Sequence, residues 1–252
     1  MVSAVILAGG AVKPELRERL GISSKGMIPL LGRIAVDFVV DAARACPQIG
    51  KVALAGPEAY RDLPVFERVE AFVPDAGRIP ANLLNAMAAL NEEDGQGRRV
   101  AGDSPLLTGE ALERFLAQVP EGADLCYPVV TKQGIMAAFP DREWTLLRLR
   151  EGPVVCTNVL YFRAPLLGRF EALANQIEVA RRKPWKLAAL FGLGLALKFI
   201  LRRLSIPDVE RRLSKMLDAN CRGVLSDDPL LAMDLDDLRD LPLVEEFLKG
   251  RG

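Results

Sequence analysis

The chain begins Met1-Val-Ser-Ala-Val-Ile-Leu-Ala-Gly9-Gly10, an apolar run that ends on two glycines. This pattern predicts a buried strand over residues 2–7, followed by a turn of bare backbone at the carboxyl edge of a sheet. Open α/β sheets bind ligands at that edge. Because a glycine turn allows close approach and presents successive free N–H groups, it suits phosphate oxygens. We call Gly9-Gly10 the glycine turn.

The composition narrows the class of protein. The 252 residues fit one large α/β domain. The 33 basic and 33 acidic side chains balance, which gives no indication of a nucleic-acid partner. The four cysteines lie far apart and indicate reduced thiols in a cytoplasmic protein. The absence of histidine excludes Ser-His-Asp and Cys-His catalysis, so chemistry must depend on carboxylates, lysines, arginines, backbone amides or a metal held by oxygen.

Strand and helix patterns alternate over the first part of the chain. We expect strands at 2–7, 51–55, 69–73 and 99–102, and helices at 34–45, 79–91 and 109–118, the last capped by Thr108. This alternation predicts a Rossmann-like, mostly parallel mixed sheet flanked by helices.

The later part of the chain changes character. Strand-like runs at 125–130, 135–139, 144–149 and 154–163 predict antiparallel additions to the sheet. Helical patterns follow at 165–182, 184–204 and 207–218, each opened by proline, then a short strand at 230–235 and a closing helix. We therefore expect a single domain over 1–252, with a helical elaboration at 164–219.

Two groups of carboxylates are candidate metal ligands. Asp103 ends a buried strand, where its carboxylate points into the ligand crevice or caps the next turn. Mg²⁺ prefers one or two carboxylates together with phosphates and waters. Asp234 and Asp236 share a face if a strand extends through them, and the alternative is an acidic helix cap. For Asp237 and Asp240 we favour the cap.

Lys25 is the candidate phosphate-binding cation. It lies in the loop-like stretch Gly-Ile-Ser-Ser-Lys-Gly, from which its ammonium could reach the glycine turn and neutralise phosphate oxygens during transfer. The alternative is a solvated surface lysine. The position of Lys25 between the glycine turn and Pro29-Leu30-Leu31-Gly32-Arg33 favours the phosphate-binding role.

Together these motifs resemble the MobA-like nucleoside-triphosphate transferases, which have a glycosyltransferase-A-type fold. The resemblance is carried, in order, by Leu7-Ala8-Gly9-Gly10, Lys25, Pro29-Leu30 with Gly32-Arg33, Gly102-Asp103-Ser104-Pro105-Leu106-Leu107, Met233-Asp234-Leu235-Asp236 and Asp240-Leu241.

The resemblance implies an Mg²⁺-dependent nucleotidyltransferase that moves a nucleoside monophosphate from an NTP to a phosphorylated acceptor. It assigns catalytic roles to Lys25 and Asp103, and metal binding to Asp103 with Asp234 or Asp236. The expected nucleotide-binding residues are Leu7, Ala8, Gly9, Gly10, Lys13, Lys25, Asn82, Gly102 and Asp103. The acceptor, molybdopterin, a sugar 1-phosphate or a similar phosphomonoester, would meet Asn158, Lys183 and Lys186.

The sequence departs from this family's pattern near the glycine turn. The usual arginine is missing, and residues 11–24 separate Gly10 from Lys25, so Lys13, Arg17 or Arg19 could substitute. Asn82 reads a base edge or is an ordinary residue at a helix start, and Asn158 contacts the acceptor or satisfies backbone groups.

The segment 184–203 has competing interpretations. Its apolar run, 187–197, is shorter than the roughly 20 residues that a spanning helix needs. A helix packed on the domain, or on a second subunit in a homodimer, is favoured. A lid over the acceptor that uses Lys183 or Lys186 comes next, followed by contact with a membrane or a lipid-linked acceptor.

Two other functions remain open. A glycosyltransferase that uses a nucleotide sugar shares this type of fold, and Lys25 favours the nucleotidyltransferase over it. The altered glycine loop would suit a catalytically inactive nucleotide-binding or scaffold protein.

Overall fold

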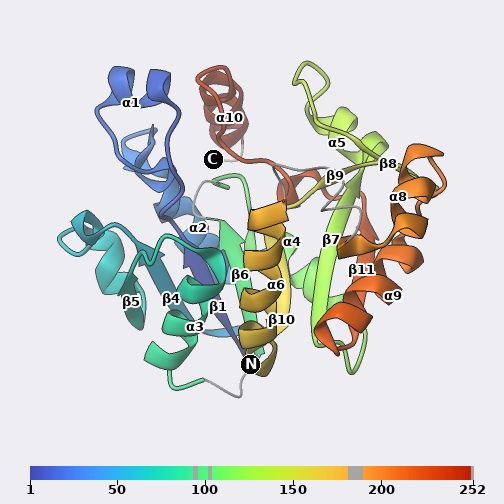
Figure 1. The fold of residues 1–252 in the computed structure, drawn as a ribbon. Coiled ribbons are helices and arrows are strands. Elements are labelled where there is room, and N and C mark those ends of the chain that lie inside the picture. The colour runs from blue at the N-terminus through green and yellow to red at the C-terminus, as the bar shows by residue number, and fades with distance from the viewer. Residues whose placement is uncertain (93–95, 102–103, 181–189, 251–252) are drawn as a thin grey trace.

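A computed structural model describes residues 1–92, 96–101, 104–180 and 190–250. Its centre is one mixed sheet in the order β5-β4-β1-β6-β10-β7-β9-β8, with β11 beside β7 (Figure 1). The strands are β1 (Val2–Leu7), β4 (Ile49–Gly56), β5 (Ala71–Pro74), β6 (Gln96–Ala101), β7 (Leu125–Thr131), β8 (Leu147–Leu149), β9 (Gly152–Cys156), β10 (Val159–Arg163) and β11 (Cys221–Ser226). A separate hairpin joins β2 (Pro29–Leu30) to β3 (Arg33–Ile34).

The strand directions confirm the predicted mixed sheet. β1 pairs in parallel with β4 and β6, and β4 in parallel with β5. β10 is antiparallel to both β6 and β7, and β8 and β9 add antiparallel pairs beyond β7. The carboxyl ends of β1 and its parallel neighbours therefore meet at one edge, as the ligand crevice requires.

Helices cover both faces of this sheet. They are α1 (Pro14–Leu20), α2 (Ala35–Ala45), α3 (Ile79–Ala89), α4 (Gly109–Ala117), α5 (Lys132–Ala138), α6 (Leu167–Ala180), α8 (Leu193–Ile200), α9 (Ile206–Leu217) and α10 (Asp240–Lys249). Alternate residues of β1 divide between the layers. Ile6 packs in the cluster that includes α2, α4 and α10, and Val5 in the one that includes α3 and the start of α6.

Caps fix several helix starts. The Thr108 hydroxyl accepts a hydrogen bond from the Ala111 N–H at 3.1 Å, which confirms the predicted cap of α4. Ser205 and Asp208 form a capping box at α9, where Pro207 occupies the first turn.

Two strand predictions are wrong. Residues 135–139 lie mostly in α5, because the Thr131 hydroxyl accepts from the Gly134 N–H at 3.0 Å and starts a helix directly after β7. Residues 230–235 form a 3-10 turn followed by a loop. The Asp228 carboxylate caps this turn by accepting from the Leu230 N–H at 3.1 Å. The strand that joins the sheet here is β11, which the sequence patterns did not indicate.

The predicted strand over 154–163 is interrupted. β9 and β10 follow each other along one edge of β7, while β11 pairs along the whole of the other edge. Between them the Thr157 hydroxyl donates to the Pro128 carbonyl at 2.8 Å, and the Asn158 N–H donates to the Leu231 carbonyl at 3.3 Å. This break turns Asn158 out of the sheet register.

Candidate active site

The glycine turn leaves β1 at the predicted edge. The Ala8 N–H still donates to the Ala55 carbonyl of β4 at 2.7 Å, after which Gly9 and Gly10 leave the sheet. Figure 1 shows α1 and α10 beyond this end of the sheet, opposite the end that carries the N-terminus. Leu7, Ala8, Gly9 and Gly10 therefore lie where the sequence predicts, at the edge that binds ligands in open α/β sheets.

The long segment between Gly10 and Lys25 closes on itself. Ala11 and Ser24 form an antiparallel bridge, and the Lys25 N–H donates to the Gly10 carbonyl at 3.0 Å. The Lys25 side chain passes over Gly10, with its Cδ 3.7 Å from the position of a Cβ there. The insertion that contains α1 thus projects outward without moving Lys25 from the glycine turn.

A buried hydroxyl cluster supports this arrangement from below. The Ser24 hydroxyl donates to the Ala8 carbonyl at 2.6 Å and lies 2.9 Å from the Tyr60 hydroxyl. Both side chains are fully buried, and a Cβ at Gly26 would overlap the Tyr60 hydroxyl. Tyr60 is a positioning residue that sequence reasoning missed, because its nearest partners are distant in the sequence.

Asn82 positions Asp75 beside the glycine turn. Its Nδ2 donates to Asp75 Oδ1 and its Oδ1 accepts from the Ala76 N–H, both at 2.7 Å. The Asp75 carboxylate lies directly against Gly9, where a Cβ would overlap it. Asn82 is only 5% exposed, so its described role is structural, and its predicted contact with a base stays a prediction.

A cavity of about 690 Å³ is lined by residues that include Asn158, Asp234 and Asp236. We call it the Asn158 cavity. Asn158 Nδ2 donates to Asp234 Oδ2 at 3.0 Å, so the break between β9 and β10 faces the loop before α10. Asp236, on the same wall, forms an ion pair with Lys25. Asp236 therefore links the cavity that Asn158 lines to the predicted phosphate-binding Lys25.

Arg142 also lines this cavity, although no periodic pattern in the sequence indicates it. Its guanidinium donates to Asp240 at 2.8 Å and to Asp234 at 3.2 Å, and stacks on the Trp144 ring at 4.1 Å. Burial by itself would lower the pKa of Arg142, but the hydrogen bonds and charge of Asp240 and Asp234 outweigh burial and raise it. Arg142 thus presents a permanent positive charge.

The late aspartates have separate roles. The Asp240 carboxylate accepts from the N–H groups of Asp236 and Asp237, both at 2.9 Å, and Asp237 accepts from the Arg239 N–H at 3.1 Å. The helix cap favoured for Asp237 and Asp240 is not formed, because both carboxylates accept from N–H groups of the turn before α10, and the N-cap residue Arg239 makes no side-chain cap hydrogen bond. The strand proposed to align Asp234 with Asp236 is absent from the described 232–239 loop, although both side chains line the Asn158 cavity.

The remaining predicted residues divide into two groups. Lys13 precedes α1, and its ammonium lies 3.6 Å from the Asp237 carboxylate. Asp237 directly follows Asp236, which forms the ion pair with Lys25. Outside the described residues lie Gly102, Asp103, Lys183 and Lys186.

Mg²⁺ takes oxygen ligands from one or two carboxylates, from phosphates and from waters. Within the described ranges, no group of three acidic or sulfur-bearing side chains forms a metal cage. Asp234 and Asp236 nevertheless bring two carboxylates to one cavity wall, which fits an ion that takes one or two carboxylates and completes its shell with phosphates and waters.

Comparison with known proteins places this fold and site in a family. The model of the MobA-like NTP transferase domain matches residues 4–187. A hypothetical transferase from Thermus thermophilus is 32% identical and superimposes with a TM-score of 0.82 over 96% of this chain and 100% of its own. A search of curated proteins finds no significant match.

Two more distant solved structures share the fold. A CMP:2-keto-3-deoxy-manno-octonic acid synthetase, solved with CTP, is 12% identical, with a TM-score of 0.60 over 100% of this chain and 99% of its own. A 4-diphosphocytidyl-2C-methyl-D-erythritol synthase from Anaerococcus prevotii is 12% identical, with a TM-score of 0.59 over 99% of this chain and 96% of its own.

The mixed α/β fold and the match to the family model define a nucleotide-handling transferase. The chain belongs to the MobA-like NTP transferase family and is a nucleotidyltransferase.

Proposed function

We propose that the chain, as a single domain, transfers a nucleoside monophosphate from an NTP to a phosphorylated small molecule and releases pyrophosphate. The observation that carries this proposal is the position of Lys25, held over Gly10 by the 3.0 Å backbone hydrogen bond and paired with Asp236 in the cavity wall. A lysine in this position can follow the charge of a triphosphate that wraps around the glycine turn. The similar fold that was solved with CTP supports an NTP as the donor.

The reaction needs little from the protein except positioning and charge. An oxygen of the acceptor phosphate forms a bond to the α-phosphorus of the NTP. The bond from that phosphorus to the oxygen bridging to the β-phosphate breaks, and pyrophosphate leaves. Because the acceptor phosphate is already an anion near neutral pH, no general base is required, which agrees with a chain that contains no histidine.

Residues of the Asn158 cavity supply the acceptor site. The Asn158 amide can donate to an acceptor oxygen, and Arg142 keeps its charge against the same wall. A volume of about 690 Å³ lies within the range of sites for small organic ligands. Lys183 and Lys186 stay proposed acceptor contacts.

Mg²⁺ completes the proposal. Asp234 and Asp236 would hold it together with Asp103, which the family resemblance names. When bound, the ion would neutralise phosphate charge and order the triphosphate.

The test is a screen for pyrophosphate release. Each of the four NTPs is incubated with Mg²⁺ and a panel of phosphorylated acceptors. We expect turnover with one combination and a kcat/KM that falls roughly 10²- to 10³-fold in Lys25→Ala, the range for loss of one preorganised charge or donor. Asp103→Ala should lose Mg²⁺-dependent turnover.

Lys249→Ala is the matched control, because Lys249 is exposed on α10 and its ammonium lies 3.9 Å from Glu245. Its kinetics should equal those of the wild type. Failure to release pyrophosphate with any combination, together with no Mg²⁺-dependent NTP binding, would overturn the proposal. If the protein consumes a nucleotide sugar and releases no pyrophosphate, the site is assigned to glycosyl transfer instead.

A further inference from the structure

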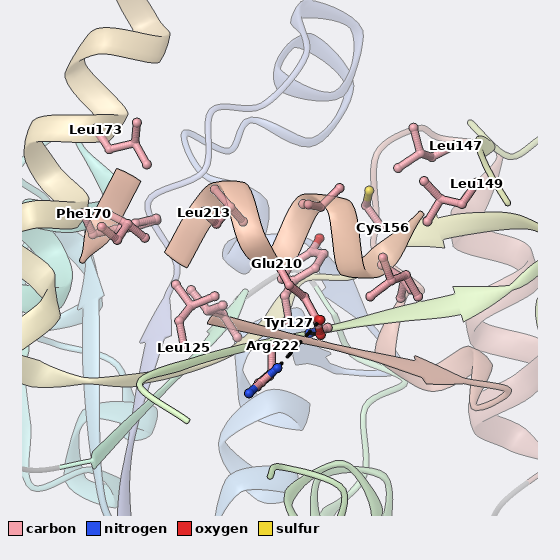
Figure 2. A pocket seen from close by; sticks show the side chains of 16 residues that line it. Leu125, Tyr127, Leu147, Leu149, Cys156, Phe170, Leu173, Glu210, Leu213 and Arg222 are labelled. Atoms are coloured by element: carbon pink, nitrogen blue, oxygen red, sulfur yellow. Dashed lines mark hydrogen bonds and ion pairs between the residues drawn. The ribbon is translucent and has the colours of Figure 1, made fainter. Parts of the chain in front are cut away.

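A second cavity, almost entirely apolar, lies between α9 and the sheet. It has a volume of about 390 Å³, and its walls come from the strands β7, β8, β9, β10 and β11 and from the helices α6 and α9 (Figure 2). We call it the apolar pocket. Protein interiors are close-packed, with few voids larger than a water molecule. The pocket is partly open to solvent, and it leaves apolar side chains uncovered by other described residues, which is a mark of a binding surface.

One wall of the pocket is α9, which packs on the rest of the protein at both of its ends. At its start, Ile206 rests on Gly223 of β11, where a Cβ would overlap the isoleucine side chain. At its end, Leu217 is 1% exposed within the cluster shared with α6. Val209 and Leu213, between these two ends, line the cavity.

The charged groups in the pocket wall are already occupied by protein partners. Glu210 Oε1 accepts from the Gly223 N–H at 2.8 Å, and its other oxygen lies 4.0 Å from the Arg222 guanidinium (Figure 2). The ligand that this lining favours is therefore a hydrocarbon chain.

The apolar pocket adjoins the Asn158 cavity. Tyr127, Leu147 and Cys156 line both, so the two spaces share a wall. The Tyr127 hydroxyl donates to the Thr157 carbonyl at 2.6 Å, next to Asn158. A molecule with a phosphate beside Asn158 and Arg142 would thus have an apolar space next to it for its remaining part.

We propose that the acceptor is an amphiphilic phosphomonoester, whose phosphate binds in the Asn158 cavity and whose hydrocarbon chain fills the apolar pocket. This inference rests on the proposed nucleotidyl transfer, because that function makes the Asn158 cavity the acceptor site. The product would be a nucleoside diphosphate ester of an apolar alcohol.

Helix α8 supports this class of acceptor independently. Its exposed apolar side chains include Leu193 and Ile200, which are 77% and 74% exposed, and its Phe199 lines the Asn158 cavity. Arg202 and Arg203 follow directly and are also exposed. An apolar helix face next to cations is typical of contact with an anionic lipid surface, where such an acceptor resides. Among the described helices, none is long and apolar enough to cross a membrane.

The test uses ethyl, octyl and dodecyl phosphate, each below its micelle-forming concentration. The first readout is maleimide labelling of Cys156 without NTP. Cys156 is exposed, whereas the other cysteines are buried, and burial also raises the pKa of the Cys221 thiol. We expect dodecyl phosphate to slow labelling at least about tenfold and ethyl phosphate to have no effect. Affinity should rise by up to about fourfold per methylene.

Leu213→Trp fills the pocket and should make the labelling rate of Cys156 independent of the chain length of the phosphate. Val209→Phe is a second substitution that fills the pocket with a smaller ring. Lys215→Trp places the same ring on an exposed position of α9 and should keep the dependence. Thermal unfolding of each variant verifies the fold. If the labelling rate of Cys156 in the wild type does not change with the chain length of the alkyl phosphate, the inference is overturned.

The second readout, pyrophosphate release, separates this inference from the proposed function. Equal kcat/KM for ethyl and dodecyl phosphate would keep nucleotidyl transfer and refute the amphiphilic acceptor. Chain-length-dependent protection that Leu213→Trp abolishes, without pyrophosphate release from any acceptor, would keep the apolar ligand and refute the transfer.

Discussion

Lys25 and Asp236 form an ion pair, although 211 positions separate them in the sequence. Lys25 is 17% exposed and Asp236 is 49% exposed, so the lysine is the more enclosed partner and the carboxylate faces the cavity. The pair joins the glycine turn to the loop before α10. It keeps a cation in place before nucleotide binds and leaves the carboxylate accessible.

This geometry predicts the effect of Asp236→Asn. If Asp236 ligates Mg²⁺ as proposed, the Mg²⁺ concentration for half-maximal pyrophosphate release should rise at least about tenfold. Glu245→Gln removes a carboxylate from the exposed part of α10 and should leave the Mg²⁺ titration unchanged. An unaltered Mg²⁺ requirement together with a raised KM for NTP would instead limit Asp236 to holding Lys25.

The contact between Gly26 and Tyr60 predicts a coupled pair of substitutions. Gly26→Ala places a methyl group on the Tyr60 hydroxyl and should cost about 1–3 kcal/mol in the free energy of unfolding, the usual range for overpacking. Tyr60→Phe removes that hydroxyl and its contact with Ser24, at about 0.5–1.5 kcal/mol. In the double variant the nearest remaining neighbours of the new methyl are Ala8 Cβ at 3.1 Å and the ring Cζ of residue 60 at 3.4 Å, so a shift of a few tenths of an ångström relieves the contact and the methyl costs less than in the single variant.

Urea unfolding of the four proteins measures this coupling. The double variant should be more stable than the sum of the single effects predicts, by at least about 0.5 kcal/mol. Strict additivity would show that Tyr60 does not limit the space at Gly26.

Local patterns were sufficient for much of the fold and for part of the site. The strand at 2–7, the glycine turn and the Thr108 cap depend on neighbouring residues, and the structure has all three. Short apolar runs were less informative, since periodicity does not separate a buried strand from a helix turn. At 135–139 and 230–235 the outcome was set by caps from the Thr131 hydroxyl and the Asp228 carboxylate.

The cavity could not be read from the sequence. Arg142 reaches Asp234 and Asp240 only because the segment after α5 lies across the loop before α10, a contact between positions more than 90 residues apart. Likewise, the pairing of Ala11 with Ser24 brings Lys25 back to Gly10, and no residue pattern in this stretch of the sequence predicts that pairing. Tertiary adjacency decided these contacts.

Asp208 predicts a pH dependence of stability. Hydrogen bonds from Lys198 and Ser205 lower the pKa of Asp208 from 3.8 to about 2. A carboxyl whose pKa is lower in the folded state stabilises the fold above its unfolded pKa, and this contribution is lost as pH falls from about 4 towards about 2. Asp208→Asn should therefore be less stable than the wild type at pH 6, and the difference should shrink between pH 4 and pH 2.

Urea unfolding at a series of pH values measures this difference. Asp218→Asn is the control, because the Asp218 side chain is 98% exposed. Curves for wild type and Asp208→Asn that remain parallel down to pH 2 would refute the assigned role.

The exposed face of α8 predicts binding to lipid vesicles. Wild-type protein should sediment with vesicles that contain phosphatidylglycerol, and less so at high salt, because Arg202 and Arg203 contribute attraction that salt screens. Replacing Leu193 and Ile200 together by serine should lower the partition coefficient at least about tenfold, since burying one such side chain contributes roughly 1.5–3 kcal/mol. Leu225→Ser, at a residue 42% exposed on β11, should bind like the wild type. Wild-type protein that stays in the supernatant at low salt would refute the lipid contact. If the double serine variant also loses the protection of Cys156 by dodecyl phosphate, α8 shapes the pocket instead of contacting a membrane.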